Sequence, residues 1–276
     1  MRPIGGTSPR NTEARAYTLW PVVPPNSTTT YTLRLANAAI DGPTPLVHVY
    51  QVSTSQAIFP IADSSYTVLT PAESDTVLAV GAWVHRKNWT DWTGVNRSSS
   101  QTLDTLASFS SRGPRIDGAL KPDIVAPGSM TISLRDGTFA NNSSSIISND
   151  GVNDGTGPAN YYVAQGTSMA APLAAGGAAL VREAFPTLTA AQIRSRLIAS
   201  ASAAADPTNA IGHGMIDILA ALAVDAADLD RNGIVDGADV GLLLSAWGAC
   251  PGCPADLTGD GVVDGADMGL LLADWG

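Results

Sequence analysis

Small side chains dominate one long apolar run in the second half of the chain. Apart from Pro172, every residue from Met169 to Val181 is Ala, Gly, Leu, Val or Met. This run predicts a helix over 168–185 that can lie close against a sheet, with Pro172 in a first turn that needs no N–H from it. Ser168 then stands at the start of the helix, among unpaired N–H groups and the positive end of the helix dipole. Such groups can hold a developing oxyanion.

Shorter apolar runs predict the rest of the secondary structure. Runs at 77–84, 123–126 and 160–164 predict strands, and Thr189 predicts the cap of a second helix. Strands that alternate with helices indicate an α/β domain with a parallel sheet. By contrast, residues 15–66 alternate polar and apolar side chains between prolines, which predicts short antiparallel strands.

Five segments occur in a fixed order along the chain. They read TVLAVGA at 76–82, FSSRGP at 109–114, KPDIVAPG at 121–128, GTSMAAP at 166–172 and GHGMID at 212–217. Together they resemble the motifs of the subtilisin-like serine proteases, the subtilases of peptidase family S8. The resemblance implies that residues 67–224 form the C-terminal half of a subtilisin-like parallel-sheet domain. It also implies that Ser168 is the nucleophile of a serine endopeptidase that acts on protein or peptide substrates.

The other catalytic groups of that family are not found in the sequence. The subtilisin triad follows the chain order Asp, His, Ser, and the resemblance places the Asp in D-[ST]-G and the His in H-G-T. Neither context occurs here, and neither does the GN turn that holds the oxyanion asparagine of the family. His48, His85 and His213 lie in contexts typical of a strand, a strand end and the domain-closing segment. We therefore expect a truncated catalytic domain and a chain that is inactive by itself.

Residues 225–276 contain an internal repeat. The segments 228–248 and 256–276 are identical at 14 of 21 positions. Each opens with a twelve-residue pattern that offers calcium oxygens at positions 1, 3, 5, 7, 9 and 12, with Gly at position 6. The expected ligands of the first loop are Asp228, Asp230, Asn232, the Ile234 carbonyl, Asp236 and Asp239. Those of the second loop are Asp256, Thr258, Asp260, the Val262 carbonyl, Asp264 and Asp267.

Two such loops, each followed by one short apolar helix, resemble the dockerin type I module. The resemblance implies Ca²⁺ as the cofactor and a cohesin-like protein as a partner. Thr258 departs from the Asp or Asn usual at position 3, and the alternative for either loop is an acidic turn without metal. The apolar residues after the loops are expected mostly in the core of the module; they are Leu242–Leu244, Leu270–Leu272, Trp247 and Trp275.

The negative charge of the chain is concentrated in this repeat. The net charge is −10 at pH 7, and residues 225–276 contain ten Asp and one basic residue, Arg231. Because no basic face is present, nucleic acid is not an expected partner. No apolar run reaches the length of a membrane span.

Cys250 and Cys253 are the only cysteines of the chain. A small disulfide is the favoured interpretation, and a redox CxxC motif is the alternative. A disulfide indicates an oxidising compartment, so we expect an extracellular, secreted protein. The first residues of the chain do not form the apolar core of a signal peptide.

The expected organisation has three parts. A β-rich segment at 1–66, similar to insertions in some subtilases, precedes an α/β peptidase domain at 67–224 and a small helical calcium-binding module at 225–276. The first functional hypothesis is a serine endopeptidase that works through an acyl-enzyme on Ser168. The alternative is a calcium-dependent docking module attached to an inert protease fragment.

Overall fold

The computed structural model describes residues 3–7, 13–17 and 63–276, except 139–143 and 204. Contacts divide the chain into two units, Met1–Ile61 and Ala62–Gly276. In the first unit, β1 (Pro3–Thr7) pairs antiparallel with β2 (Glu13–Tyr17). The other strands expected before residue 62, and His48, lie outside the described residues.

A parallel strand pair forms the centre of the second unit. Strand β3 (Val80–Trp83) pairs with β6 (Ile124–Pro127), in a register that places Val80 opposite Ile124. On the other side of β6, Met215 forms a parallel bridge with Val125. The first three residues of β6 are fully buried, as a strand covered on both faces requires. The two expected strands are thus present, and each is four residues long.

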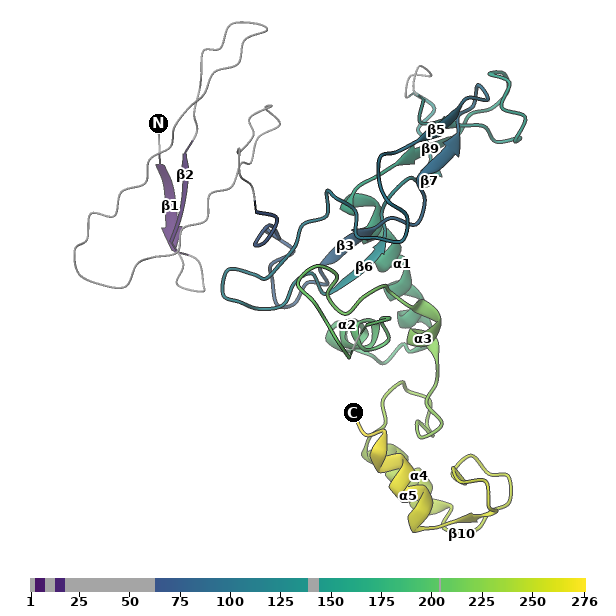
Figure 1. The fold of residues 1–276 in the computed structure, drawn as a ribbon. Helices are drawn as coiled ribbons and strands as arrows, with labels where there is room; N and C mark the ends of the chain where they lie inside the picture. Colours follow the sequence, from purple (N-terminus) through teal and green to yellow (C-terminus); the bar gives the residue numbers. More distant parts are fainter. Residues whose placement is uncertain (1–2, 8–12, 18–62, 139–143, 204) are drawn as a thin grey trace, which may run out of the picture. The chain divides into compact units, whose positions relative to one another are not determined.

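Three helices pack beside this strand pair. Helix α1 (Thr167–Ala184) contacts β3, β6, α2 (Ala190–Ala199) and α3 (Ile218–Leu222), as Figure 1 shows. The small residues allow the close approach: its buried positions are Ala170, Ala174, Gly177 and Val181. Thr189 caps α2 in a capping box with Gln192, which confirms that helix start.

The position of Pro172 differs from the prediction. Helix α1 begins at Thr167, so Pro172 lies inside the helix and beyond its first turn. There its missing N–H would have bonded the carbonyl of Ser168, four residues earlier. The proline therefore removes a helix hydrogen bond from the residue expected to be the nucleophile.

Antiparallel strands extend from the loops that follow β3 and β6. Strand β4 (Asn88–Thr90) pairs with β5 (Asn96–Ser98). Strands β7 (Thr131–Leu134) and β8 (Ile146–Ile147) flank β9 (Tyr161–Ala164) in a three-stranded sheet. The expected strand at 160–164 is confirmed as β9. The β4–β5 pair and β8, which lies in the expected polar loop, were not anticipated from the sequence.

The repeat folds as two short helices with a small ladder. Helix α4 (Gly237–Ser245) contacts α5 (Gly265–Ala273), and β10 (Gly248–Ala249) pairs antiparallel with β11 (Val262–Val263). Its core consists of Ala227, Val235, Leu243, Ala255, Val263 and Leu271. Cys250 and Cys253 form a disulfide, which confirms the expected bridge.

The prediction that the leucines and tryptophans after the loops form the core of the repeat is mostly wrong. Among the leucines and tryptophans that follow the loops, only Leu243 and Leu271 are buried. The exposed ones are Leu242, Leu244, Trp247, Leu270, Leu272 and Trp275. Leu243 on α4 and Leu271 on α5 are the fully buried leucines, and the partly buried Val240 and Met268 pack beside them, so the flanking leucines turn outward. The helices in the described part of the chain include none long and apolar enough to span a bilayer.

Candidate functional site

Ser168 lies exposed on the second residue of α1, immediately after a sharp turn. Gly166 makes this turn with φ of 149°, in a region that side chains rarely adopt. The N–H of Gly166 donates to the Gly128 carbonyl at 2.8 Å, and the N–H of Met169 donates to the Gly166 carbonyl at 3.0 Å. Since Gly128 follows β6, these bonds fix the serine at the carboxyl end of that strand.

The start of α1 offers hydrogen-bond donors beside the hydroxyl group. Gly166 provides no side-chain cap, and the first turn holds no acidic residue. The N–H groups of Thr167 and Ser168 therefore have no partner from the helix itself. They carry the positive end of the helix dipole, so an oxygen that gains negative charge next to Ser168 would be stabilised there.

His213 lies at the opposite end of β6 from Ser168. Its N–H donates to the Asp123 carbonyl at 2.8 Å, just before the strand begins. At about 3.3 Å per residue, the chain from Asp123 to Gly128 extends for about 16 Å. His213 therefore lies too far away to accept the proton of the Ser168 hydroxyl.

His85 lies two residues beyond β3, at the same edge of the strand pair as Ser168. Partial burial, and then the charge of Arg86, lower the pKa of its imidazole below the usual 6.5. A base poised for Ser168 would share a hydrogen bond with the hydroxyl group. Within the described residues the structure forms no such bond, so it brings together the serine and the N–H donors but no triad.

The two expected calcium loops have the same hydrogen-bond pattern. The position-12 carboxylate of Asp239 accepts N–H bonds from Asp230 at 3.1 Å and Asp236 at 2.8 Å. In the second loop, Asp267 accepts bonds from Thr258 at 2.9 Å and Asp264 at 2.8 Å. Each position-12 residue thus ties position 3 to position 9, which closes the loop around its oxygens.

The carboxylates at position 1 organise the turn of each loop. Asp228 accepts N–H bonds from Asn232 at 3.0 Å and Gly233 at 2.7 Å. Asp256 accepts the corresponding bonds from Asp260 at 3.1 Å and Gly261 at 2.8 Å. Asp236 and Asp264, at position 9, cap helices α4 and α5.

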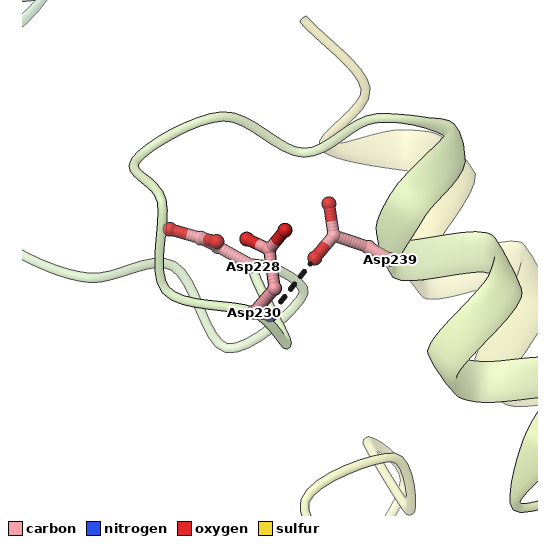
Figure 2. Close-up of side chains that lie close together, drawn as sticks. All are labelled: Asp228, Asp230 and Asp239. Carbon is pink, nitrogen blue, oxygen red and sulfur yellow. Dashed lines mark hydrogen bonds between the residues drawn. The ribbon is translucent and has the colours of Figure 1, made fainter. Parts of the chain in front are cut away.

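Three carboxylates converge in the first loop. Asp228, Asp230 and Asp239 each place an oxygen within 4.8 Å of the others (Figure 2). Burial raises the pKa of Asp228, and the charges of Asp239 and Asp230 add to this effect. Asp228 and Asp239 are buried, so a cation between them would relieve repulsion that water does not screen well. The residues present therefore fit calcium.

The second loop gathers fewer acidic oxygens. Its residues are all described, and Asp256, Asp260 and Asp267 do not form a comparably close group. Thr258 stands where the first loop has Asp230, and its hydroxyl group lies 3.4 Å from an oxygen of Asp256. The neutral side chain at position 3 explains why the second loop brings together fewer carboxylate oxygens than the first.

The fold and the site together are those of an α/β domain with an exposed serine held at the start of a helix beside a parallel strand pair. The model of the subtilase family, Peptidase S8, matches residues 49–214. The chain belongs to this family of serine peptidases.

Two relatives by sequence agree with this membership. The chain is 38% identical over 133 residues to the serine protease AprX of Bacillus subtilis, covering 48% of this chain and 26% of that protein. It is 33% identical over 159 residues to subtilisin DY of Bacillus licheniformis, covering 57% of this chain and 41% of that protein. Among solved structures, fervidolysin from Fervidobacterium pennivorans is 29% identical with a TM-score of 0.39, over 55% of this chain and 20% of that chain. The chain therefore spans less than half the length of these relatives.

Proposed function

We propose that Ser168 is the nucleophile of a serine endopeptidase. The observation that carries the proposal is its exposed hydroxyl group at the start of α1, held there by the hydrogen bond from Gly166 to Gly128. Ser168 Oγ would attack a peptide carbonyl, and the N–H groups at the start of α1 would hold the resulting oxyanion. Loss of the amine leaves an acyl-enzyme, which water then hydrolyses.

This reaction needs a base that the described part of the chain does not place beside Ser168. A histidine must accept the Ser168 proton and return it to the leaving amine, with an Asp to orient it. His213 lies at the wrong end of β6, and His85 is not bonded to the serine. We therefore propose that the triad Asp and His come from outside these residues and that the 276-residue chain by itself does not cleave peptides.

Two measurements test this proposal. The purified chain should neither cleave casein nor react with a fluorophosphonate probe. Co-expression with a segment of a subtilase that carries the D-[ST]-G and H-G-T motifs should restore probe labelling, and Ser168→Ala should abolish it. Ser168-dependent cleavage by the chain alone would show that a local histidine acts as the base. Labelling that survives Ser168→Ala would disprove the nucleophile assignment.

A second function is supported by the first acidic loop. We propose that residues 225–276 bind two Ca²⁺ ions as a dockerin-like module, with the loop oxygens at positions 1, 3, 5, 7, 9 and 12 as ligands. The convergence of Asp228, Asp230 and Asp239 carries this proposal. Bound calcium would neutralise the loop carboxylates and hold both loops in place.

The exposed apolar side chains of α4 and α5 support a partner protein. The half-exposed leucines on both helices, and the half-exposed tryptophan that follows each helix, present a surface that a cohesin-like domain could cover. The disulfide between Cys250 and Cys253 supports an extracellular location for the module.

Calorimetry on the whole chain tests calcium binding. We expect two ions per chain and loss of one of them in Asp239→Ala, because this variant removes the carboxylate that closes the first loop. Asp267→Ala should remove the other. A chain that takes up no calcium would identify the tail as an acidic spacer.

A further inference from the structure

The first calcium loop is attached to the peptidase part of the chain through one arginine. Arg196, on α2, donates from Nε to the Ala221 carbonyl at 2.7 Å and from Nη1 to the Gly233 carbonyl at 2.6 Å. Its Nη2 donates to the carbonyl of Ala223. One guanidinium group thus joins α2, the end of α3 and the turn of the calcium loop, a set of bonds that requires the planar, multi-donor arginine.

An aromatic ring completes this attachment. The guanidinium carbon of Arg196 lies 4.3 Å from the centre of the Phe185 ring, at the end of α1. Gly233 approaches the same ring so closely that an added Cβ would lie 2.9 Å from it. Ile234, the next residue, packs against the cluster formed by Phe185 and its neighbours. The loop therefore packs against the hydrophobic core of the peptidase part.

The second loop provides an internal comparison. Gly261 has φ of 87°, close to the 93° of Gly233, so both glycines make the same turn. A Cβ on Gly261 would meet nothing closer than Pro251 at 3.8 Å. Val262, at the position of Ile234, is 41% exposed. Of the two loops, the first is therefore the one packed against Phe185 and Arg196.

From this geometry we propose that Arg196 is a positioning residue of the first calcium site and that it couples calcium binding to the peptidase part. Gly233 and Ile234 are positions 6 and 7 of the loop, and the Ile234 carbonyl is an expected ligand. The same short segment is thus held by the ion on one side and by Arg196 and Phe185 on the other. An ion that fixes this segment favours its contacts with Arg196 and Phe185, and these contacts favour binding of the ion, because coupling between two sites is reciprocal.

This inference rests on the proposed calcium binding, and it goes further by assigning the two loops different roles. Calcium in the first loop stabilises α2 and the ends of α1 and α3. Calcium in the second loop stabilises the repeat alone. The first repeat is therefore part of the folding unit of the peptidase and not an independent attachment.

Calcium titrations of the whole chain, combined with hydrogen exchange, test the coupling. Arg196→Ala should weaken calcium binding by the first loop about fivefold or more and leave the second loop unchanged. In the wild-type chain calcium should slow exchange of the α2 amides, and this protection should disappear in Arg196→Ala and in Asp239→Ala. Asp267→Ala should retain it.

If Arg196→Ala disturbs the fold of α2, a comparison of two equivalent glycine substitutions, one in each loop, still tests the coupling. Gly233→Ala and Gly261→Ala place a methyl group at the same turn position, so both strain their own loop. Only Gly233→Ala pushes against Phe185, and only this variant should remove the calcium-dependent protection of α2. Calcium uptake without any protection of α2 would overturn the coupling and leave calcium binding intact. A chain that binds no calcium would overturn both.

Discussion

The carboxylate of Asp123 lies 2.6 Å from Nη2 of Arg194, which joins the start of β6 to helix α2. The second oxygen of Asp123 accepts hydrogen bonds from Lys121 Nζ at 2.8 Å and from the Ala79 N–H at 2.6 Å. Lys121 and Asp123 are both buried. One aspartate therefore holds both strands of the parallel pair and the helix that packs beside them.

Removing this carboxylate should destabilise the peptidase part strongly. In Asp123→Ala, the Ala79 N–H loses its acceptor and the buried ammonium group of Lys121 loses its carboxylate partner and keeps the Val77 carbonyl. We expect the free energy of unfolding to fall by about 3–5 kcal/mol. Urea unfolding of the whole chain measures the loss. Asp206→Ala, at an exposed position, is the control and should change stability by less than about 0.5 kcal/mol. Equal effects of the two substitutions would contradict the role of Asp123.

Asp91 should make stability depend on acidic pH. Burial alone raises the pKa of Asp91, but hydrogen bonds from Thr93 and Arg97 outweigh it and lower the pKa from 3.8 to about 2. Its contribution is therefore present above pH 3.8 and is lost as the pH falls from 3.8 toward 2. Asp91→Asn should unfold more easily at pH 7, by about 1.5–3 kcal/mol, and lose the part of the acid dependence that Asp91 causes. An unchanged acid profile in Asp91→Asn would contradict this assignment.

Gly128 should tolerate no side chain. An added Cβ would lie 2.6 Å from the Cβ of Ala82 and 3.0 Å from the Gly166 carbonyl oxygen. We expect Gly128→Ala to cost about 1–3 kcal/mol through overpacking and to displace the turn before Ser168. Gly176→Ala, on the exposed face of α1 with nothing within 4 Å, is the control and should stabilise the chain by about 0.5–1 kcal/mol. Thermal unfolding distinguishes these opposite signs.

Substitutions of two neighbouring leucines in α5 should have very different effects on stability. Leu271 is fully buried and Leu272 is 53% exposed. Leu271→Ala should cost about 2–5 kcal/mol of stability in the calcium-loaded repeat, whereas Leu272→Ala should leave stability nearly unchanged and weaken binding of any partner protein. Denaturant titrations followed by helical circular dichroism measure the first effect. Similar losses from both substitutions would show that Leu272 belongs to the core after all.

A single substitution should strengthen the second calcium loop. Thr258→Asp supplies at position 3 the carboxylate that Asp230 supplies in the first loop. Since calcium affinity rises with the number of charged ligands, we expect about tenfold tighter binding by this loop and no change in the first. Calorimetry in an Asp239→Ala background isolates the second site. Thr258→Asn, which adds a neutral oxygen, is the control for charge.

Local signals in the sequence predicted a large part of this structure. Thr189 and Gln192 form the capping box because their spacing is itself the geometric requirement. The runs before Ser168 and Gly128 became strands because they are apolar and short. The two acidic loops follow the twelve-residue pattern because each of their hydrogen bonds links residues at most nine positions apart.

Other features of the structure could not be predicted, because no pattern in the sequence indicates them. Three consecutive leucines in each short helix carry no polar–apolar period, so the buried one cannot be distinguished from its neighbours. The β4–β5 pair contains mostly polar residues, and the hydrogen bonds of Asp91 close the turn between its strands. Arg196 binds backbone carbonyls, which every residue possesses, so its partners leave no mark in the sequence.

The buried face of α1 places unequal limits on variation along this helix. Ala170 and Ala174 are buried, and a Cβ on Gly177 would lie 2.9 Å from Ile218. The methyl groups of Ala170 and Ala174 therefore set the distance from α1 to the strands, and the backbone of Gly177 sets its distance to α3, so a larger residue at any of these positions moves Ser168 with the helix. In a saturation library selected for stable folding, Ala170 and Ala174 should accept almost nothing beyond Gly, Ala and Ser, and Gly177 should accept almost nothing beyond Gly. The exposed positions Ala171, Ala175 and Ala179 of the same helix should accept most side chains.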